Sequence, residues 1–329
     1  MKFFIPTNII EFFLFKLDLE NLYLLKIAIK LLKSFVMYKK LCYNVVMKYQ
    51  ISQNKILIEK TPDFNIFDIC HCGQLFRYFH LSGYTRIIST NQVADIVEKK
   101  DEVQIHCSSS DYFKNYFDFE TDYSSIKNSL RINDFMNDAI DFGEGIRILK
   151  QDFFETFLSF IVSQNNNIKR IQNSLNRLSQ DFGEKIDAET FAFPKYENLK
   201  NASLQYFESI GVGYRIKYLV EFIKNYTLDL QNELKRLSTE KMREQLMVFL
   251  GVGEKVADCI LLFGLNRKDV FPVDTWIDKV ACEYFGMTGQ SRSAMSKQLV
   301  EKFKNLSGYA QQYLFYYKRE LTRKGEKNE

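Results

Sequence analysis

Hydrophobic positions alternate with polar ones over residues 47–122, and from about Ile146 they recur every three or four residues. Alternation is typical of half-buried strands, whereas the longer repeat is typical of amphipathic helices. Two pairs of alternating segments are each separated by two turn-forming residues, which predicts two β-hairpins. They are 50–52 with 55–59, and 75–81 with 84–89. A further strand is predicted at 103–107, preceded by a helix at about 91–97.

Helical spacing of apolar residues continues through the second half of the chain. The stripes include Phe153, Phe157 and Ile161; Ile171, Leu175 and Leu178; Leu219, Phe222 and Ile223; Val256, Ile260 and Phe263; and Val280 with Tyr284. The pattern therefore predicts an α+β protein. An N-terminal lobe at 47–143 has an antiparallel β-sheet with helices, and an all-helical domain follows at 144–325.

Residues 1–46 differ from the rest in being rich in Phe, Leu, Ile and Lys. Charged residues interrupt every apolar stretch before it reaches the roughly 18–20 residues that a membrane span needs. A secretory signal would end in small residues at a cleavage site, and none follow. An interfacial amphipathic helix stays open, because Leu24, Ile27, Leu31 and Phe35 share one stripe. We favour a mis-called start, with Met47 as the first residue and 1–46 as an extension.

Composition narrows the class of protein. The chain of 329 residues is 46% hydrophobic and 26% charged, with 14 Gly and 4 Pro, which excludes disordered and collagen-like proteins. A net charge of +4 permits a polyanionic partner without indicating one. The 30 Phe and 19 Tyr are interpreted mainly as core filling.

The six cysteines are scattered. Only Cys70 and Cys72 lie close together, and a C-x-C pair with no second pair is too short for the usual zinc knuckle. No four-cysteine run near the C-terminus could hold an iron–sulfur cluster. We therefore expect reduced thiols in a cytoplasmic protein and no metal site.

A glycine-rich turn precedes the first candidate for chemistry. Gly251 and Gly253 flank Val252 between two predicted helices, where exposed N–H groups suit a phosphate oxygen, although such turns are usually only tight connections. Lys255 follows at the edge of an apolar stripe, one turn before Cys259. An amine held against apolar surface loses hydration, which favours its neutral, nucleophilic form.

Asp274 follows Pro272 at a predicted helix start. Taken separately, Asp274 is most simply a helix cap and Lys255 a solvated surface lysine. Taken together, the segment LGVGEKVADCI at 250–260 and PVDTW at 272–276 resembles the helix-hairpin-helix DNA glycosylases, and most closely their 8-oxoguanine DNA glycosylase and AP lyase branch.

Further segments carry the same resemblance, in the family's order. They are CGQLFR at 72–77, GIRILKQD at 145–152 with SFIVSQNNNIKRI at 159–171 as the family's central helix and asparagine loop, GVGYR at 211–215, and SGYAQQYLF at 307–315 as its terminal helix. The resemblance covers about residues 48–322. It implies a helix-hairpin-helix glycosylase domain that excises 8-oxoguanine from duplex DNA in base excision repair.

The resemblance also assigns the catalytic pair. Lys255 matches the lysine that attacks the anomeric carbon, expels the base and forms a Schiff base, after which β-elimination nicks the strand. Asp274 matches the aspartate that stabilises the cationic sugar. The base must leave the stack before the amine can reach the sugar.

Base recognition is assigned in the same way. Gly73 matches the residue whose carbonyl accepts the N7 hydrogen that guanine lacks. Gln311 and Phe315 match residues that bind the Watson–Crick edge and stack on the base, and their i, i+4 spacing places them on one helical face. Core packing is the alternative for Phe315. Cys259 matches a cysteine of the base pocket.

Opposite the lesion, Asn165, Arg170 and Arg215 match residues that contact cytosine, and Tyr214 matches one that wedges into the gap. The resemblance therefore predicts a preference for lesions opposite cytosine. Two positions depart from the family: Trp276 stands where many members have a histidine that contacts phosphate, and Lys318 replaces an acidic residue.

No cofactor is expected, apart from a structural cation that loop carbonyls of the hairpin could hold. We expect a monomer that acts on double-stranded DNA, with no membrane partner, at the nucleoid of a prokaryote or in the nucleus of a eukaryote. Two alternatives stay open. One is a non-catalytic helix-hairpin-helix DNA-binding protein, which would not need both Lys255 and Asp274. The other is a glycosylase for another damaged base.

Overall fold

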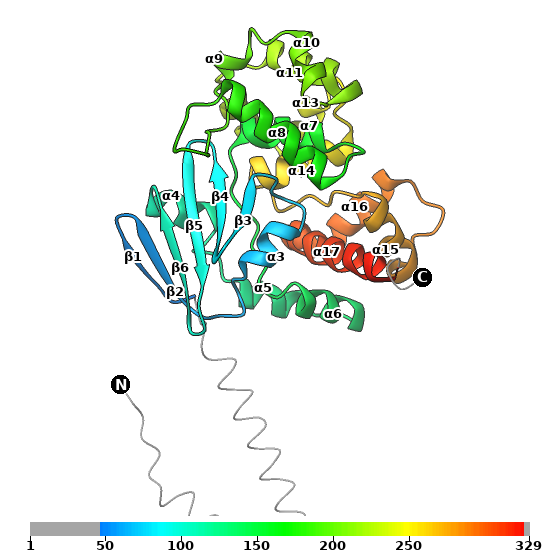
Figure 1. Cartoon of the computed structure of the whole chain (residues 1–329). Helices are drawn as coiled ribbons and strands as arrows, with labels where there is room; N and C mark the ends of the chain where they lie inside the picture. The colour runs from blue at the N-terminus through cyan, green and yellow to red at the C-terminus, as the bar shows by residue number, and fades with distance from the viewer. Residues whose placement is uncertain (1–46, 326–329) are drawn as a thin grey trace, which may run out of the picture. The chain divides into compact units, whose positions relative to one another are not determined.

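The computed structural model describes residues 47–325, so the extension predicted at 1–46 lies outside the described residues. A six-stranded antiparallel sheet forms the N-terminal lobe, and helices form the rest (Figure 1). The α+β fold predicted from the sequence is confirmed. Along the sheet the strands run β1-β2-β6-β5-β4-β3. Their bounds are β1 Tyr49–Ser52, β2 Lys55–Glu59, β3 Tyr78–Leu81, β4 Tyr84–Ser89, β5 Gln92–Glu98 and β6 Glu102–Cys107.

Both predicted hairpins form. Ser52 pairs with Lys55 at the end of the first, and Leu81 pairs with Tyr84 at the end of the second. Gly83 has a φ of 90° in the second turn, a conformation that costs little only for glycine. Strand β3 begins at Tyr78 rather than at residue 75; residues 75–77 are buried but do not pair with β4 as part of the strand.

The helix predicted at 91–97 is wrong: this segment is strand β5. Ala94 and Ile96 are buried in the sheet core while their neighbours are half-buried, which is the period-two pattern of a strand. β5 is hydrogen-bonded to β4 on one side and β6 on the other. Pairing on both sides therefore decides the structure of a segment that is too short to be assigned by its own pattern.

Helical spacing of apolar residues begins at about Ile146, but four helices of the structure precede that residue. Their bounds are α3 Ile66–His71, α4 Ser110–Tyr116, α5 Tyr123–Leu130, α6 Asp134–Phe142, α7 Phe153–Ser163, α8 Ile168–Phe182, α9 Tyr196–Leu199, α10 Leu204–Ser209, α11 Ile216–Asn225, α12 Leu230–Lys235, α13 Thr239–Leu246, α14 Glu254–Gly264, α15 Thr275–Phe285, α16 Arg292–Phe303 and α17 Ser307–Gly325. Two 3₁₀ turns lie at Gly213–Arg215 and Lys304–Leu306.

Residues 145–152 are not part of a helix; the central helix begins at Phe153, with Asp152 as its cap. The side-chain amide of Gln74 binds this segment at two points. Its Nε2 donates to the carbonyl of Arg147 at 2.8 Å, and its Oε1 accepts the N–H of Leu149 at 2.9 Å. Gln74 thus pairs with this segment as a neighbouring strand would, and joins it to the β lobe.

The described residues contain two hydrophobic cores. One lies between the sheet, α3 and α4, and the other fills the space among α5 to α17. Helix α17 packs on α6, α15 and α16, and α14 packs on α7 (Figure 1). No helix between residues 47 and 325 is long and apolar enough to cross a membrane. The domain boundary at residues 143 and 144 stays a prediction.

Candidate active site

Three helices begin at the wall of one cleft of about 720 Å³. Gly253 and Lys255 come from the start of α14, Asp274 and Thr275 from the start of α15, and Arg292 from the start of α16. The opposite wall is the loop that joins α7 to α8, together with Tyr214. Helix N-termini carry partial positive charge, so the convergence favours a negatively charged ligand such as a phosphodiester.

The turn between α13 and α14 has the sharp geometry that the two glycines predict. Gly251 has a φ of 83°, and a Cβ at this position would lie 2.4 Å from the ring of Tyr218. A side chain is therefore excluded for two reasons, backbone strain and collision. Gly253 caps α14 with open space beside it, which lets another molecule approach the first N–H groups of the helix.

Lys255 is half-buried, and its Nζ lies 5.8 Å from the centre of the Phe160 ring. One turn later on the same helical face, the Cys259 thiol is buried and feels the charge of Lys255. Burial raises the pKa of Cys259 to about 11, against the opposing effect of the lysine charge. The thiol therefore stays protonated at neutral pH and is a poor nucleophile.

Asp274 is both a helix cap and part of the site. Its Oδ1 accepts the N–H of Trp276 at 3.0 Å and that of Ile277 at 2.9 Å, which fixes the carboxylate at the start of α15. Burial raises its pKa, whereas those N–H groups and the charges of Lys255 and Arg292 oppose the rise. The structure therefore brings Lys255 and Asp274 together as an electrostatically coupled pair.

The predicted base-recognition residues meet where α17 approaches the loop after α3. Gly73 has a φ of 86°, and a Cβ placed there would lie 2.8 Å from Cε1 of Phe315. Gln311 is one turn earlier on the same face of α17 and is buried. Its side-chain oxygen accepts no hydrogen bond within residues 47–325. A buried acceptor without a donor is costly, so a ligand with N–H groups would be favoured here.

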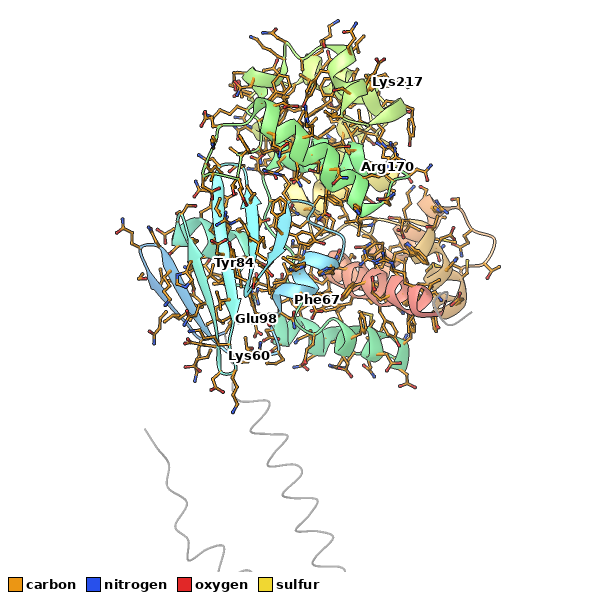
Figure 2. All side chains as sticks on the ribbon, viewed as in Figure 1. Lys60, Phe67, Tyr84, Glu98, Arg170 and Lys217 are labelled. Atoms are coloured by element: carbon orange, nitrogen blue, oxygen red, sulfur yellow. The ribbon has the colours of Figure 1, made fainter. Side chains whose placement is uncertain are left out.

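The asparagine loop and the 3₁₀ turn form the other side of the cleft. Asn165 is exposed with a φ of 43°, and Tyr214 is 52% exposed. Arg170 lies exposed in the first turn of α8, near the right-hand end of that helix in Figure 2. Arg215 differs, because it is 4% exposed and donates to the carbonyls of Gln164 at 2.7 Å and Asn165 at 2.9 Å. In this state its guanidinium supports the loop.

The structure also shows the surroundings of Trp276 and Lys318, the two positions that depart from the family. Trp276 is half-buried, and the ammonium group of Lys279 lies 5.1 Å from the centre of its ring. A cation therefore lies beside this position although histidine is absent. Lys318 pairs with Glu283 of α15 at 2.5 Å, so it joins α17 to α15.

The sequence does not identify three residues that surround the site. Phe160 stands under the amine of Lys255, and Gln312 and Arg319 of α17 hold the chain before Gly73. Arg319 follows Phe315 by four residues, so the helical spacing that groups Gln311 with Phe315 also extends to Arg319. Phe160 and Gln312 carry no such pattern, since their partners lie far away in the sequence.

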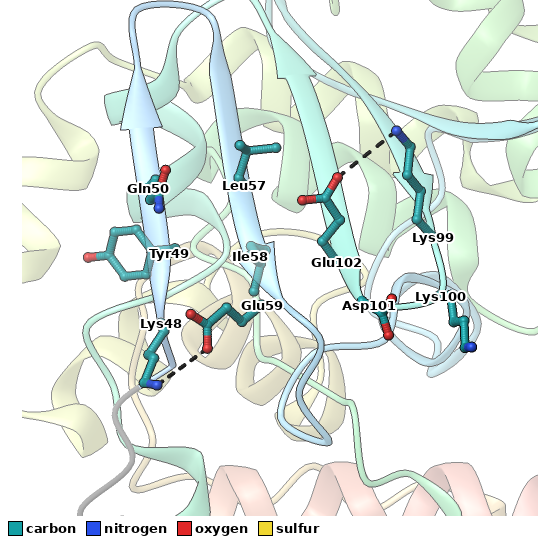
Figure 3. A pocket seen from close by; sticks show the side chains of 10 residues that line it. All are labelled: Lys48, Tyr49, Gln50, Leu57, Ile58, Glu59, Lys99, Lys100, Asp101 and Glu102. Atoms are coloured by element: carbon teal, nitrogen blue, oxygen red, sulfur yellow. Dashed lines mark ion pairs between the residues drawn. The ribbon is translucent and has the colours of Figure 1, made fainter. Parts of the chain in front are cut away.

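A second groove, of about 500 Å³, lies on the sheet between β1, β2 and the turn after β5 (Figure 3). Its charges are largely paired: Lys48 lies 3.4 Å from Glu59, and Lys99 lies 4.0 Å from Glu102. Neither pair faces a nucleophile or a buried polar group, so this groove does not compete with the cleft. Within residues 47–325, no three His, Cys, Asp or Glu side chains are placed to bind a metal ion.

Two family models match the chain in succession. Residues 55–157 match the N-terminal domain of 8-oxoguanine DNA glycosylase, and residues 158–305 match the HhH-GPD superfamily of base excision DNA repair proteins. A structure of Clostridium acetobutylicum 8-oxoguanine glycosylase/lyase bound to double-stranded DNA is 34% identical, with a TM-score of 0.78. That match covers 84% of this chain and 100% of the other.

Curated relatives agree with the family models. An N-glycosylase/DNA lyase of Saccharomyces cerevisiae is 39% identical over 42% of this chain, and one of Arabidopsis thaliana is 29% identical over 56%. The chain spans about half the length of these relatives, 41% and 56% respectively. Both family models, and a solved relative matched over its whole length, indicate the same family. The chain therefore belongs to the 8-oxoguanine DNA glycosylase family of helix-hairpin-helix base excision repair proteins.

Proposed function

We propose that this protein is a bifunctional DNA glycosylase and AP lyase that excises 8-oxoguanine from duplex DNA in base excision repair. One observation carries the proposal. Lys255 and Asp274, from the starts of two helices, line one cleft beside the hairpin and are electrostatically coupled. A protein that only binds DNA has no need for a half-buried amine held beside a fixed carboxylate.

The chemistry follows from these two groups. An unprotonated Lys255 amine attacks C1′ of the extruded nucleotide, and the bond to the base breaks with its electron pair leaving on the base, which gains a proton. The sugar ring opens to a Schiff base with Lys255. Loss of a C2′ proton then expels the 3′ phosphate and nicks the strand. Asp274 stabilises the cationic sugar, and its two backbone hydrogen bonds hold it in place for that task.

Oxidised guanine is the base that the predicted recognition residues of α17 and the loop after α3 suit best. Gln311 offers a buried oxygen that needs donors, and the Watson–Crick edge of 8-oxoguanine carries N–H groups. Phe315 supplies a stacking surface, and Gly73 supplies a carbonyl that accepts no hydrogen bond within the described residues. The N–H at N7 of 8-oxoguanine can donate to that carbonyl, whereas unmodified guanine has only a lone pair there. Cys259 completes the pocket next to Lys255.

The remaining residues hold the duplex. Gly251 and Gly253 let backbone N–H groups meet a phosphate, and Trp276 with Lys279 offers a second contact to the backbone. Asn165, Arg170 and Arg215 contact the base opposite the lesion, and Tyr214 wedges into the gap. Because arginine donates hydrogen bonds and cytosine offers acceptors at O2 and N3, we expect lesions opposite cytosine to be preferred.

No cofactor takes part in these steps. The main-chain oxygens of Leu250, Gly251 and Val252 accept no hydrogen bond within the described residues, so the hairpin could hold a structural cation through them. We propose a monomer that acts on double-stranded DNA and has no membrane partner. Its place is with chromosomal DNA, at the nucleoid of a prokaryotic cell or in the nucleus of a eukaryotic one.

The proposal is tested by incubating the purified full chain with a duplex that contains one 8-oxoguanine opposite cytosine. We expect release of the base, cleavage of the strand at the lesion, and a covalent adduct trapped by borohydride. Lys255→Gln should abolish all three and leave duplex binding largely intact, because the hairpin is unchanged.

Lys302→Gln is the matched control. Its ammonium group also lies 5.8 Å from an aromatic ring, that of Phe285, but outside the cleft. It should behave as the wild type. Excision by the Lys255→Gln variant, or binding of the duplex by the wild type without any cleavage, would contradict the proposed function.

A further inference from the structure

Two side chains of α17 hold the main chain immediately before Gly73. Gln312 donates from its side-chain amide to the carbonyl of Cys72 at 2.5 Å, and Arg319 donates from its guanidinium to the carbonyl of His71. Within the described residues, nothing donates to the carbonyl of Gly73 itself. Two successive carbonyls are thus tied to the terminal helix, and the third is left free for a ligand.

Arg319 also touches the stacking surface. Its guanidinium carbon lies 5.1 Å from the centre of the Phe315 ring, and Nε donates to Glu320 at 3.0 Å. A Cβ placed on Gly73 would lie 3.1 Å from the guanidinium of Arg319 and 2.8 Å from the ring of Phe315. Arg319 is 8% exposed, so its position is set by these contacts and not by solvent.

The guanidinium suits this double task. It is planar, so it can stack on an aromatic face while its edge donates hydrogen bonds in the same plane. One group therefore fixes both the ring of Phe315 and the loop that carries Gly73. The proposed function assigns these two groups to the same base: the Gly73 carbonyl binds its N7 edge, and the Phe315 ring stacks on its face.

We propose that Arg319 is a positioning residue for base recognition, which sets the separation between the Gly73 carbonyl and the Phe315 ring. This inference rests on the proposed function and concerns only the step in which the base is bound. Arg319 contacts neither Lys255 nor Asp274 in the structure, so a substrate that lacks a base should not depend on it.

The test compares two substrates under single-turnover conditions. One duplex carries 8-oxoguanine opposite cytosine, and the other carries an abasic site at the same position. Arg319→Met keeps the length of the side chain but loses the charge and the donors. We expect excision of 8-oxoguanine to slow by about 10- to 100-fold, as for a small misplacement of bound substrate. Cleavage at the abasic site should match the wild type.

Arg323→Met is the matched control, because Arg323 lies one turn later on α17 and contacts the same Glu320 at 3.3 Å. It should cleave both substrates normally. Arg319→Lys can still donate to His71 but has no planar group to stack, so it should show a smaller loss, again confined to 8-oxoguanine. If Arg319→Met fails to fold, the comparison of the two substrates is made with Arg319→Lys alone.

Equal losses on both substrates would overturn the inference, because a purely structural role does not distinguish them. Unchanged excision by both Arg319 variants would overturn it as well. A wild-type chain that cleaves neither duplex would instead contradict the proposed function.

Discussion

The carboxylate of Asp274 caps helix α15 and is electrostatically coupled to Lys255 at the start of α14. The two roles of Asp274 can be separated by substitution. Asparagine caps a helix about as well as aspartate but carries no charge. Asp274→Asn should therefore keep the thermal stability of the wild type and lose about 10²- to 10³-fold in the rate of base excision, the usual effect of removing one transition-state contact.

Asp274→Ala should lose the same activity and also about 1 kcal/mol of stability, because the cap is gone. Single-turnover excision and thermal unfolding of both variants check this. An Asp274→Asn variant with wild-type activity would show that the carboxylate is only a cap.

Substitutions of Arg170 and Arg215 should differ in their effect on the stability of the protein, although both residues are assigned to the opposite base. Arg170 is exposed, so Arg170→Ala should leave the free energy of unfolding within about 0.5 kcal/mol of the wild type. Arg215 is buried, and Arg215→Ala would leave the carbonyl of Asn165 without a donor and that of Gln164 with only the Tyr214 hydroxyl at 3.4 Å, at a cost of about 1–3 kcal/mol.

Both variants should lower the preference for 8-oxoguanine opposite cytosine over adenine. The measurement is the ratio of excision rates on the two duplexes, with thermal unfolding alongside. An unchanged ratio in Arg170→Ala would mean that another residue contacts the opposite base.

We expect the buried carboxyl group of Glu155 to make the stability of the protein depend on pH. Its carboxylate accepts the N–H of Thr90 at 2.7 Å and lies 3.9 Å from Arg77. Burial raises the pKa of Glu155 to about 7 from an ordinary 4.5. The folded state therefore binds more protons than the unfolded state between those values, and this contribution to stability falls as pH rises from about 4.5 to about 7.

Glu155→Gln removes that titration. The melting temperature of the variant relative to the wild type should rise across this interval and level off above pH 7. A constant difference from pH 4.5 to 7 would show that Glu155 does not titrate there.

The pH dependence of stability that Lys268 contributes has the opposite sign to that of Glu155. Its ammonium is buried without a hydrogen bond within residues 47–325, and burial lowers its pKa to about 7 from 10.5. The unfolded state binds more protons between pH 7 and 10.5, so this contribution to stability increases with pH. Lys268→Met should raise the melting temperature most at or below pH 7, and the advantage should shrink toward pH 10. A stabilisation that does not vary with pH would contradict this account.

The sequence by itself determines those parts of the protein that depend on nearby residues. Hairpin turns such as Ser82-Gly83 can be recognised from backbone preferences, and the stripes of α7, α8 and α14 follow from helical spacing. Lys255 and Asp274 also belong here, since each lies inside a short segment with a local geometry of its own. The resemblance to a family rests on the same short segments.

Only the tertiary structure decides the features that join distant segments. Residues 92–98 become a strand because β4 and β6 pair with them on both sides, and Gln74 joins residues 147–149 to the β lobe through two hydrogen bonds. Arg319 reaches a carbonyl 248 residues earlier in the chain. Burial and such long-range hydrogen bonds arise when the chain folds back on itself, and no local pattern of residues encodes them.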